Sequence, residues 1–571
     1  MTAYSHLTIE AWFTGPSKEL GNDDGYARLS EVTISAQTEI GQVEEIVVPL
    51  QRSYTGREPV ISASLADTPC TTLGIQGLLD GLNATLGTTY SLNSPSLPSL
   101  LKACIGNDWD FGTVYGYLRL VWYTNNWRTI PDELCKCEEQ DREKRRRAMD
   151  GNHIVDPSIY PRHVWDLYSN RVVPQWVPSV WPDPISHAWV DEKDRMDVWT
   201  PINRHEWPVP IPKDANLNLI RIELLNLGLE YVWLDVLCLR QRGGPREDLR
   251  VEEWMLDVPT IGRVYYMEDI VHCYLSGLGR PLSVKPGYFD SDRCWFNRAW
   301  TLQEVGTQRK ICGDTPDGPL HAKPIDEDGN YETEILTRFH KRLQSLSGIM
   351  MRSPETIDIF KMLVEMRDRV SSNPVDKVAG MAFLLWPMSI PAYYENQSLE
   401  DAWSALVNAT SEQVRASLFF LYPEPGNAGT KWRPSWDQLM TKPLPRCGST
   451  SCKSRVYRDT RANNDQCRAR CIEKGFVRGL AGRGTPGEDH QHGELLVEDA
   501  DGITRTFKII ANPRYPIPED TYTLVKDVRS ERWVVGRRLQ EKSFEKMSLF
   551  EIKNTGKLSI LSKMYSLNIL V

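Results

Sequence analysis

Three residues near the middle of the chain have the types and the spacing of a chemical site. Asn297, Trp300 and Glu304 fall in a segment whose pattern predicts a helix over Arg293–Val305. In a helix they would stand at positions i, i+3 and i+7, so that an amide, an indole and a carboxylate share one face. A carboxylate beside an aromatic platform can stabilise a positive charge that develops during a reaction. The structural alternative is that Glu304 pairs with Arg298 while Trp300 packs in the core.

A second set of polar residues is expected where a buried strand ends. Residues Tyr231–Leu239 are continuously apolar except for Asp235, which predicts a strand buried on both faces. A carboxylate in such a strand must be hydrogen-bonded or must point to the functional edge of the sheet. The next loop, Arg240–Arg246, sets Arg240 and Arg242 beside a Gly-Gly pair, and its guanidinium and N–H groups could hold a diphosphate. The alternative is a solvated basic turn.

Ser186, His187 and Trp189 belong to a shorter strand, predicted over Pro184–Trp189. The carboxyl ends of parallel strands meet at one edge of a sheet. We therefore expect these three side chains near Asp235, where they either shape a pocket or only pack.

Four cysteines near the start of the β-rich region are candidate ligands for a metal ion. Cys447, Cys452, Cys467 and Cys471 are clustered, but they lack the two-residue knuckles that are typical of zinc sites. We expect no metal, with a zinc module as the alternative. Walker, HExxH and GxSxG motifs are absent from the sequence.

The composition excludes several classes of protein. The 571 residues, 41% hydrophobic and 25% charged, describe an ordinary globular chain. With 67 basic and 76 acidic residues the formal charge is −9, so no global field recruits nucleic acid or an anionic membrane. No window approaches the ~18 apolar residues of a membrane span, and the N-terminal residues lack the features of a signal peptide. The scattered cysteines suit a reducing compartment, so a cytoplasmic protein without a nucleic-acid partner is expected.

The elements that must position these residues form an α/β fold. Apolar runs alternate with helical patterns over residues 184–310, which predicts a parallel sheet covered by helices. A helix from Asp214 to Gly228 and a strand at Val271–Leu275 complete this part. The predicted organisation is a family-specific region of mixed structure (1–160), the α/β domain (161–320), a helical segment (321–445) and a β-rich region (446–571). The helices are expected at Asp132–Asp150, Tyr331–Ser347, Glu355–Val370, Val375–Trp386 and Leu399–Tyr422, and the late strands at Gly493–Glu498, Thr504–Ile510, Thr521–Lys526, Arg532–Leu539 and Phe544–Ile552.

Three motifs in this order resemble the fungal heterokaryon incompatibility (HET) domain. They are Ile185-Ser-His-Ala-Trp189, Tyr231-Val-Trp-Leu-Asp-Val-Leu-Cys-Leu-Arg-Gln241 and Trp295-Phe-Asn-Arg-Ala-Trp-Thr-Leu-Gln-Glu304. A later element, Trp432-Arg-Pro-Ser-Trp436, looks like one often found after HET domains. The chain departs from the pattern at His187, Val190 and Ala299, where Tyr, Gly and Gly are more common. The resemblance covers residues 180–310.

The resemblance implies a role in non-self recognition and regulated cell death. HET domains have also been likened to TIR domains, whose flavodoxin-like parallel sheet supports NAD cleavage by one glutamate. By this analogy Glu304 would be catalytic and NAD would be a substrate, with no permanently bound cofactor. The substrate would contact the residues Ser186, His187, Trp189, Asp235, Arg240, Arg242, Asn297, Arg298 and Trp300. The alternative is a non-enzymatic signalling module that self-associates or docks a protein partner.

Overall fold

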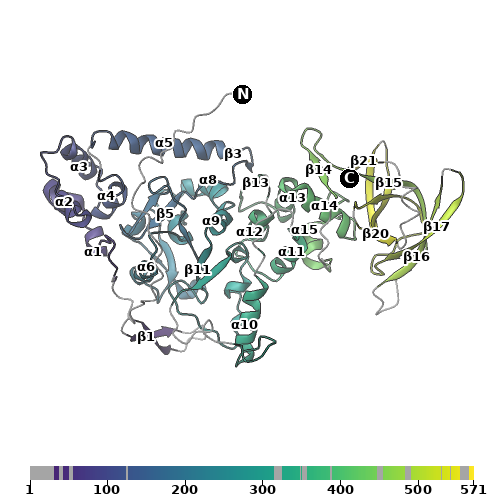
Figure 1. The fold of residues 1–571 in the computed structure, drawn as a ribbon, viewed down its shortest axis with the longest axis horizontal. Coiled ribbons are helices and arrows are strands. Elements are labelled where there is room, and N and C mark those ends of the chain that lie inside the picture. Colours follow the sequence, from purple (N-terminus) through teal and green to yellow (C-terminus); the bar gives the residue numbers. More distant parts are fainter. Residues whose placement is uncertain are drawn as a thin grey trace.

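The computed structural model describes most of the chain. It leaves out residues 1–30, 38–42, 50–53, 55, 124–125, 314–323, 347–348, 350–356, 386, 388, 446–453, 483–489, 500, 529, 541 and 553–564. Figure 1 shows an elongated molecule, with the N-terminal helices and a central sheet on one side and a second sheet at the far end. In this view the helices α11 to α15 lie between the two sheets, and α10 lies at the lower edge of the molecule.

The N-terminal region is mainly helical. It begins with the antiparallel pair β1 (Glu31–Gln37) and β2 (Val43–Pro49). The helices α1 (Ala63–Ala66), α2 (Cys70–Leu86), α3 (Leu97–Gly106) and α4 (Phe111–Leu118) follow. The long helix α5 (Ile130–Ala148) confirms the helix expected there and runs along the upper edge of the molecule in Figure 1. Two short strands, β3 (Met149–Asp150) and β4 (His153–Ile154), pair with each other, and β4 also pairs with β13 (Ile390–Pro391) of the helical segment.

The central sheet has the strand order β12-β11-β7-β10-β5-β6. Four strands are parallel: β7 (Asp183–His187), β10 (Tyr231–Trp233), β11 (Ile270–Tyr274) and β12 (Gln308–Ile311). The other two, β5 (His163–Asp166) and β6 (Arg171–Pro174), are antiparallel. The α/β architecture with parallel strands is therefore confirmed, within a mixed sheet. Because β7 lies between β10 and β11, the chain changes direction across the sheet at β7, which is where open α/β sheets bind ligands.

Helices connect these strands. Between β7 and β10 lie the hairpin β8 (Arg195–Val198) and β9 (Val209–Pro212) and the helix α6 (Leu217–Asn226). The Asn216 side chain caps α6, whereas Asp214, the expected start, pairs with Arg280. The helices α7 (Asp235–Cys238), α8 (Asp248–Asp257) and α9 (Ile261–Met267) link β10 to β11. Tyr265 of α9 packs edge to face on Trp233, which fixes α9 against the sheet.

The strand predicted over Tyr231–Leu239 is wrong beyond Trp233. The chain stays extended at Leu234 and then turns into α7, so Asp235 begins a helix just past the carboxyl end of β10. An apolar run buried on all sides has the same composition in a strand and in a buried helix, so its periodicity could not distinguish them.

The helix predicted over Arg293–Val305 is also wrong. The segment forms two short 3-10 turns, Trp295–Asn297 and Trp300–Leu302, with extended backbone at Arg298 between them. Asn297, Trp300 and Glu304 therefore do not share a helical face. Arg298 forms a β-bridge with Val370 instead, so a tertiary contact overrides the local helical pattern.

The segment after the central sheet is helical, as expected. Its helices are α10 (Glu334–Ser345), α11 (Ile359–Arg367), α12 (Asp376–Ala382), α13 (Leu399–Ala409), α14 (Glu412–Leu421) and α15 (Trp436–Thr441). The one helix expected over Leu399–Tyr422 is two helices, because Thr410 is extended and Ser411 caps α14.

The C-terminal region is a mainly antiparallel sheet that closes on itself, with β20 and β21 as its one parallel pair among the described strands, which confirms the expected β-rich region. The strands are β14 (Val456–Asp459), β15 (Asn464–Arg478), β16 (Gln491–Glu498), β17 (Thr504–Ala511), β18 (Asp520–Lys526), β19 (Arg532–Arg538), β20 (Ser543–Ile552) and β21 (Tyr565–Leu570). The long strand β15 pairs with both β16 and β18 and so completes the closure. Trp533, Leu495, Ile509 and other apolar side chains fill the interior.

Candidate functional site

Ser186 and Glu304 meet at the carboxyl edge of the central sheet. Ser186 lies in β7, and Glu304 follows the second 3-10 turn, just before β12. The Ser186 hydroxyl donates a hydrogen bond of 2.5 Å to Glu304 Oε2 and accepts one of 2.7 Å from the indole Nε1 of Trp295. Ser186 and Trp295 are fully buried, whereas Glu304 is partly exposed. The relay Trp295–Ser186–Glu304 thus fixes one carboxylate oxygen and leaves the group accessible.

A second carboxylate lies beside this one. Asp235 accepts a hydrogen bond from the indole of Trp189 at 3.1 Å, and its other oxygen lies 2.8 Å from His187 Nε2. The backbone N–H of Val236, in the first turn of α7, also donates to Asp235 at 2.7 Å. The structure therefore brings Ser186, His187, Trp189, Asp235 and Glu304 together from three separate parts of the sequence.

The two carboxylates have opposite pKa shifts. Burial raises the pKa of Glu304 to about 7, and Asp235 adds to this, although Ser186 and His187 act against it. Burial also acts to raise the pKa of Asp235, but His187 outweighs it, so that pKa is below its ordinary value. Burial tends to lower the pKa of His187, yet the Asp235 carboxylate raises it overall. Near neutral pH the site therefore holds an ionised Asp235 and a Glu304 that is close to its titration midpoint.

Residues of the helical segment fix the loop that carries Glu304 by hydrogen bonds. Arg369, almost fully buried, donates from Nη1 to the Arg298 carbonyl and to Thr301 Oγ1, both at 2.7 Å. Val370 N–H donates to the Asn297 carbonyl at 2.6 Å, and Ala299 N–H donates to the Val370 carbonyl at 2.9 Å. No sequence pattern pointed to Arg369, because its partners, a backbone carbonyl and a threonine hydroxyl, lie more than 65 residues away in the sequence.

Asn297 and Trp300 have mainly structural partners. The Asn297 amide donates to the carbonyls of Phe289 and Ser291, at 2.8 and 3.0 Å, and so shapes its own loop. The Trp300 indole interacts with the Asp376 carboxylate, and its ring lies 6.2 Å from that of Tyr393. Trp300 therefore packs toward α12 rather than beside Glu304 as a stacking platform.

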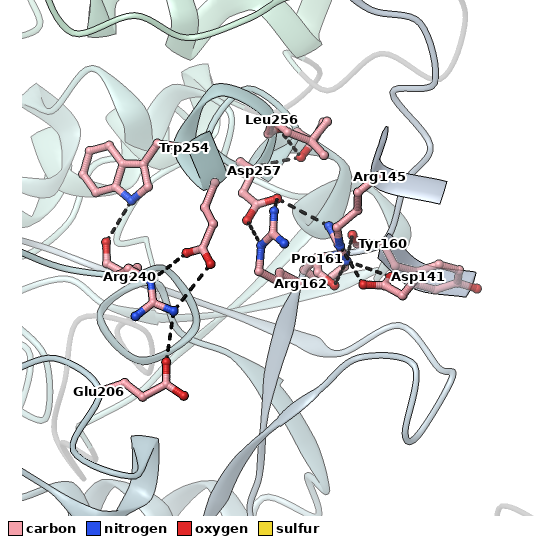
Figure 2. A network of polar contacts seen from close by, with 12 residues as sticks. Asp141, Arg145, Tyr160, Pro161, Arg162, Glu206, Arg240, Trp254, Leu256 and Asp257 are labelled. Carbon is pink, nitrogen blue, oxygen red and sulfur yellow. Dashed lines mark hydrogen bonds and ion pairs between the residues drawn. The ribbon is translucent and has the colours of Figure 1, made fainter. Parts of the chain in front are cut away.

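Arg240 and Arg242 do not form a free phosphate loop. Arg240 is buried and pairs with Glu206 and Glu253, each at 3.0 Å, in the polar network of Figure 2. Arg242 is exposed and pairs with Glu395 at 3.3 Å. The expected diphosphate role is therefore opposed by existing ion pairs, because a ligand would have to replace them.

Arg298 differs from these arginines. Its side chain is partly exposed and makes no hydrogen bond or ion pair with any residue that the structure describes. The pair with Glu304 that the structural alternative required is not formed, and Glu304 is bonded to Ser186. Within the described part of the chain, the Arg298 guanidinium therefore experiences only longer-range electrostatic effects, from Arg293 and from the carboxylates of Asp376, Glu304 and Asp292.

The described residues hold no cluster of metal-ligating side chains. Cys447 and Cys452 of the zinc alternative lie outside the described residues. Cys467 and Cys471 are buried in β15, and burial raises the pKa of both thiols, which disfavours the thiolate that zinc requires.

No protein-family model, curated protein or solved structure matches this chain. Among the described residues, no helix is both long and apolar enough to cross a membrane. The function must therefore be argued from the site itself.

Proposed function

We propose that this chain is a HET-type protein of non-self recognition and regulated cell death, and that its Glu304 site cleaves the N-glycosidic bond of NAD. The observation that carries the proposal is the partly exposed Glu304 carboxylate, bonded to Ser186, with a pKa raised to about 7 beside the Asp235–His187 pair. Perturbed carboxylates that meet at a sheet edge are typical of catalytic sites.

The chemistry needs one carboxylate near the sugar. When the bond between ribose C1′ and the pyridinium nitrogen breaks, the electron pair stays with nitrogen and nicotinamide leaves as a neutral molecule. The ribose becomes an oxocarbenium-like centre, which an ionised Glu304 would stabilise. Water then adds to C1′ and releases its proton to solvent, which gives ADP-ribose. The leaving group needs no proton, so the ionised form of Glu304 is the active one.

The strand order supports the TIR-like part of the proposal. In chain order the four parallel strands stand second, first, third, fourth across the sheet, as they do in flavodoxin-like folds. Ser186 and His187 end the first of these strands, and Asp235 follows the second. The proposed active site thus occupies the place where such sheets bind nucleotides.

The test is nicotinamide release from NAD by the purified chain, followed by chromatography at several protein concentrations. Glu304→Gln keeps the shape and the hydrogen bond from Ser186 but removes the charge. We expect release by the wild type and a loss of roughly a hundred- to a thousand-fold in the folded variant. Equal release by both proteins would contradict the role of Glu304.

The second candidate function is a non-enzymatic docking or self-association module. The observation that favours it is that two large apolar side chains at the β8–β9 hairpin, Trp199 and Met196, are 50% and 43% exposed and could contact a partner. Absence of nicotinamide release at every concentration, together with self-association that Trp199→Ser abolishes, would favour this function over the enzyme.

A further inference from the structure

The Trp295 indole makes a buried hydrogen bond to the site, and chemistry fixes its direction. Trp295 is fully buried, and its Nε1–H donates to the Ser186 hydroxyl at 2.7 Å. An indole N–H donates and never accepts, so it occupies one lone pair of the Ser186 oxygen. The Ser186 proton must then point to another acceptor, and Glu304 Oε2 lies 2.5 Å away. These are the two hydrogen bonds that the hydroxyl forms with described residues, so the indole makes Ser186 a donor to Glu304.

This direction favours the ionised form of Glu304. A hydroxyl that donates to a carboxylate forms a stronger hydrogen bond than one that donates to a neutral carboxyl group. Burial raises the pKa of Glu304 to about 7, and the Ser186 hydrogen bond is the largest effect that acts against burial. Without the indole N–H, the hydroxyl could turn and accept a hydrogen bond from the protonated carboxyl group, which would stabilise the neutral form. The indole therefore controls whether Ser186 supports the charge or the proton.

The loop between β11 and β12 holds the indole in this position. The Trp295 carbonyl accepts a hydrogen bond of 2.6 Å from Thr301 Oγ1, which itself accepts one of 2.7 Å from the buried Arg369. The Trp295 ring packs edge to face on Phe296, with 5.3 Å between the ring centroids. The backbone and the ring are thus both fixed, so the indole N–H stays directed at Ser186.

We propose that Trp295 is a positioning residue, whose indole N–H holds the Ser186 hydroxyl as a donor to Glu304 and so favours the ionised carboxylate that the reaction needs. The inference rests on the proposed function for its catalytic meaning, whereas the hydrogen bonds that it uses exist without a substrate. The other titratable groups that interact with Glu304 are unchanged when Trp295 is replaced. They are His187 of β7, Asp235 of α7, Tyr265 of α9, Cys273 of β11, Arg298 of the same loop and Arg369 after α11.

The test replaces Trp295 with phenylalanine, which keeps an aromatic ring but removes the N–H. The control is Trp165→Phe in β5 of the same sheet, because Trp165 is also fully buried and its indole has no hydrogen-bond partner among the described residues. Infrared titration of the carboxyl band, taken as the difference between each protein and its Glu304→Gln form, gives the Glu304 midpoint. We expect Trp295→Phe to raise this midpoint by about 0.5 to 1 pH unit and Trp165→Phe to leave it within about 0.2.

A double-mutant cycle shows whether Trp295 acts through Ser186. If it does, Trp295→Phe should no longer move the Glu304 midpoint when Ser186 is already alanine. A merely structural loss would lower the stability in both backgrounds without moving the midpoint in either. Equal midpoints in Trp295→Phe and Trp165→Phe, or a shift that persists in the Ser186→Ala background, would overturn the inference.

The wild type offers a measurement that needs no change at Trp295. In the protein isotope-labelled at its indole nitrogens, one indole N–H resonance should titrate with the Glu304 midpoint, because the Ser186 hydroxyl links the two groups. The same resonance should stop titrating in Glu304→Gln. If no indole resonance follows Glu304, the inference fails, even where Trp295→Phe does not fold.

Nicotinamide release separates this inference from the proposed function. In Trp295→Phe the midpoint of the pH profile of kcat should move upward together with the Glu304 titration. If the wild type releases no nicotinamide but the titration shifts as expected, the cleavage proposal fails and the positioning role of Trp295 stands. If the wild type cleaves NAD and Trp295→Phe leaves the pH profile in place, the positioning role fails and the cleavage proposal stands.

Discussion

Two carboxylates a few residues from the sheet edge differ because their partners differ. Asp235 has three donors, the His187 ring, the Trp189 indole and the Val236 N–H, and these hold its charge in place. Glu304 is buried enough to disfavour its charge, it has only the neutral donor Ser186 among the described residues, and it lies near the charge of Asp235, so its protonated form is favoured. Such a separation of pKa values assigns different roles to the two groups: a fixed anion and a titrating one.

The first prediction concerns Ser186→Ala. The change removes the donor to Glu304 and the acceptor of the buried Trp295 indole, so the pKa of Glu304 should rise above about 7. The unfolding free energy should fall by about 1–3 kcal/mol. Infrared titration of the carboxyl band and denaturant unfolding measure the two effects. The control is Ser417→Ala, a buried serine within α14, and a Glu304 pKa that stays unchanged in Ser186→Ala would contradict the account.

The second prediction concerns the stability of the protein against pH. The folded state binds a proton at Glu304 more tightly than the unfolded state, with a pKa of about 7 against 4.5. The unfolding free energy therefore falls as the pH rises from about 4.5 to 7. Between these pH values the unfolding free energy of Glu304→Gln should fall less than that of the wild type. The difference between the two falls is at most roughly 3 kcal/mol, and the partial exposure of the carboxylate makes it smaller. Denaturant unfolding at several pH values checks it, and parallel curves would contradict the raised pKa.

At the scale of elements, the sequence predicted strands and helices well where the pattern was local. The strands β7 and β11 and the hairpin β16–β17 lie where their periodicity placed them. The segment 293–305 was not predictable in the same way, because the extended backbone at Arg298 depends on a bridge to Val370, 72 positions later. Five of the expected site residues do meet: Ser186, His187, Trp189, Asp235 and Glu304. They meet because the carboxyl ends of neighbouring parallel strands lie at one edge of the sheet, even where the segment after the strand folds differently from the prediction.

The third prediction tests this long-range clamp with Arg369→Gln. The loop would lose the hydrogen bonds to the Arg298 carbonyl and Thr301, and Glu304 would lose a nearby positive charge that lowers its pKa. We expect a loss of about 2–4 kcal/mol in unfolding free energy and a further rise of the Glu304 pKa. Thermal unfolding and infrared titration measure both. A stable variant with an unchanged Glu304 pKa would show that Arg369 does not position the loop.

At the scale of the molecule, the helical segment joins the two sheets. Its Arg369 and Val370 hold the site loop of the central sheet, and its helix α14 contacts the C-terminal sheet. There the fully buried Lys546 of β20 donates to the carbonyls of Phe419 and Tyr422, at 2.8 and 2.6 Å. The sequence predicted each region but not these contacts, because a lysine in an alternating strand is typical of an exposed face.

The fourth prediction concerns this buried lysine. Burial lowers the pKa of Lys546 to about 7 from 10.5, so above pH 7 the unfolded state binds more protons and the wild type gains stability as the pH rises toward 10.5. Lys546→Met leaves the carbonyls without a donor, which should cost about 1–3 kcal/mol at pH 7. The difference between the two proteins should then widen with pH. A constant difference in denaturant unfolding between pH 7 and 10 would contradict the lowered pKa.

The central claim is that the ionised Glu304 carboxylate performs the reaction, and the pH dependence of NAD cleavage tests it most directly. We predict that kcat for nicotinamide release rises with pH to a plateau, with its midpoint near the Glu304 pKa of about 7, and that Ser186→Ala moves the midpoint upward. Glu304→Gln should show a low rate without this midpoint. A rate that falls through pH 7, or a profile that Glu304→Gln leaves unchanged, would contradict the account.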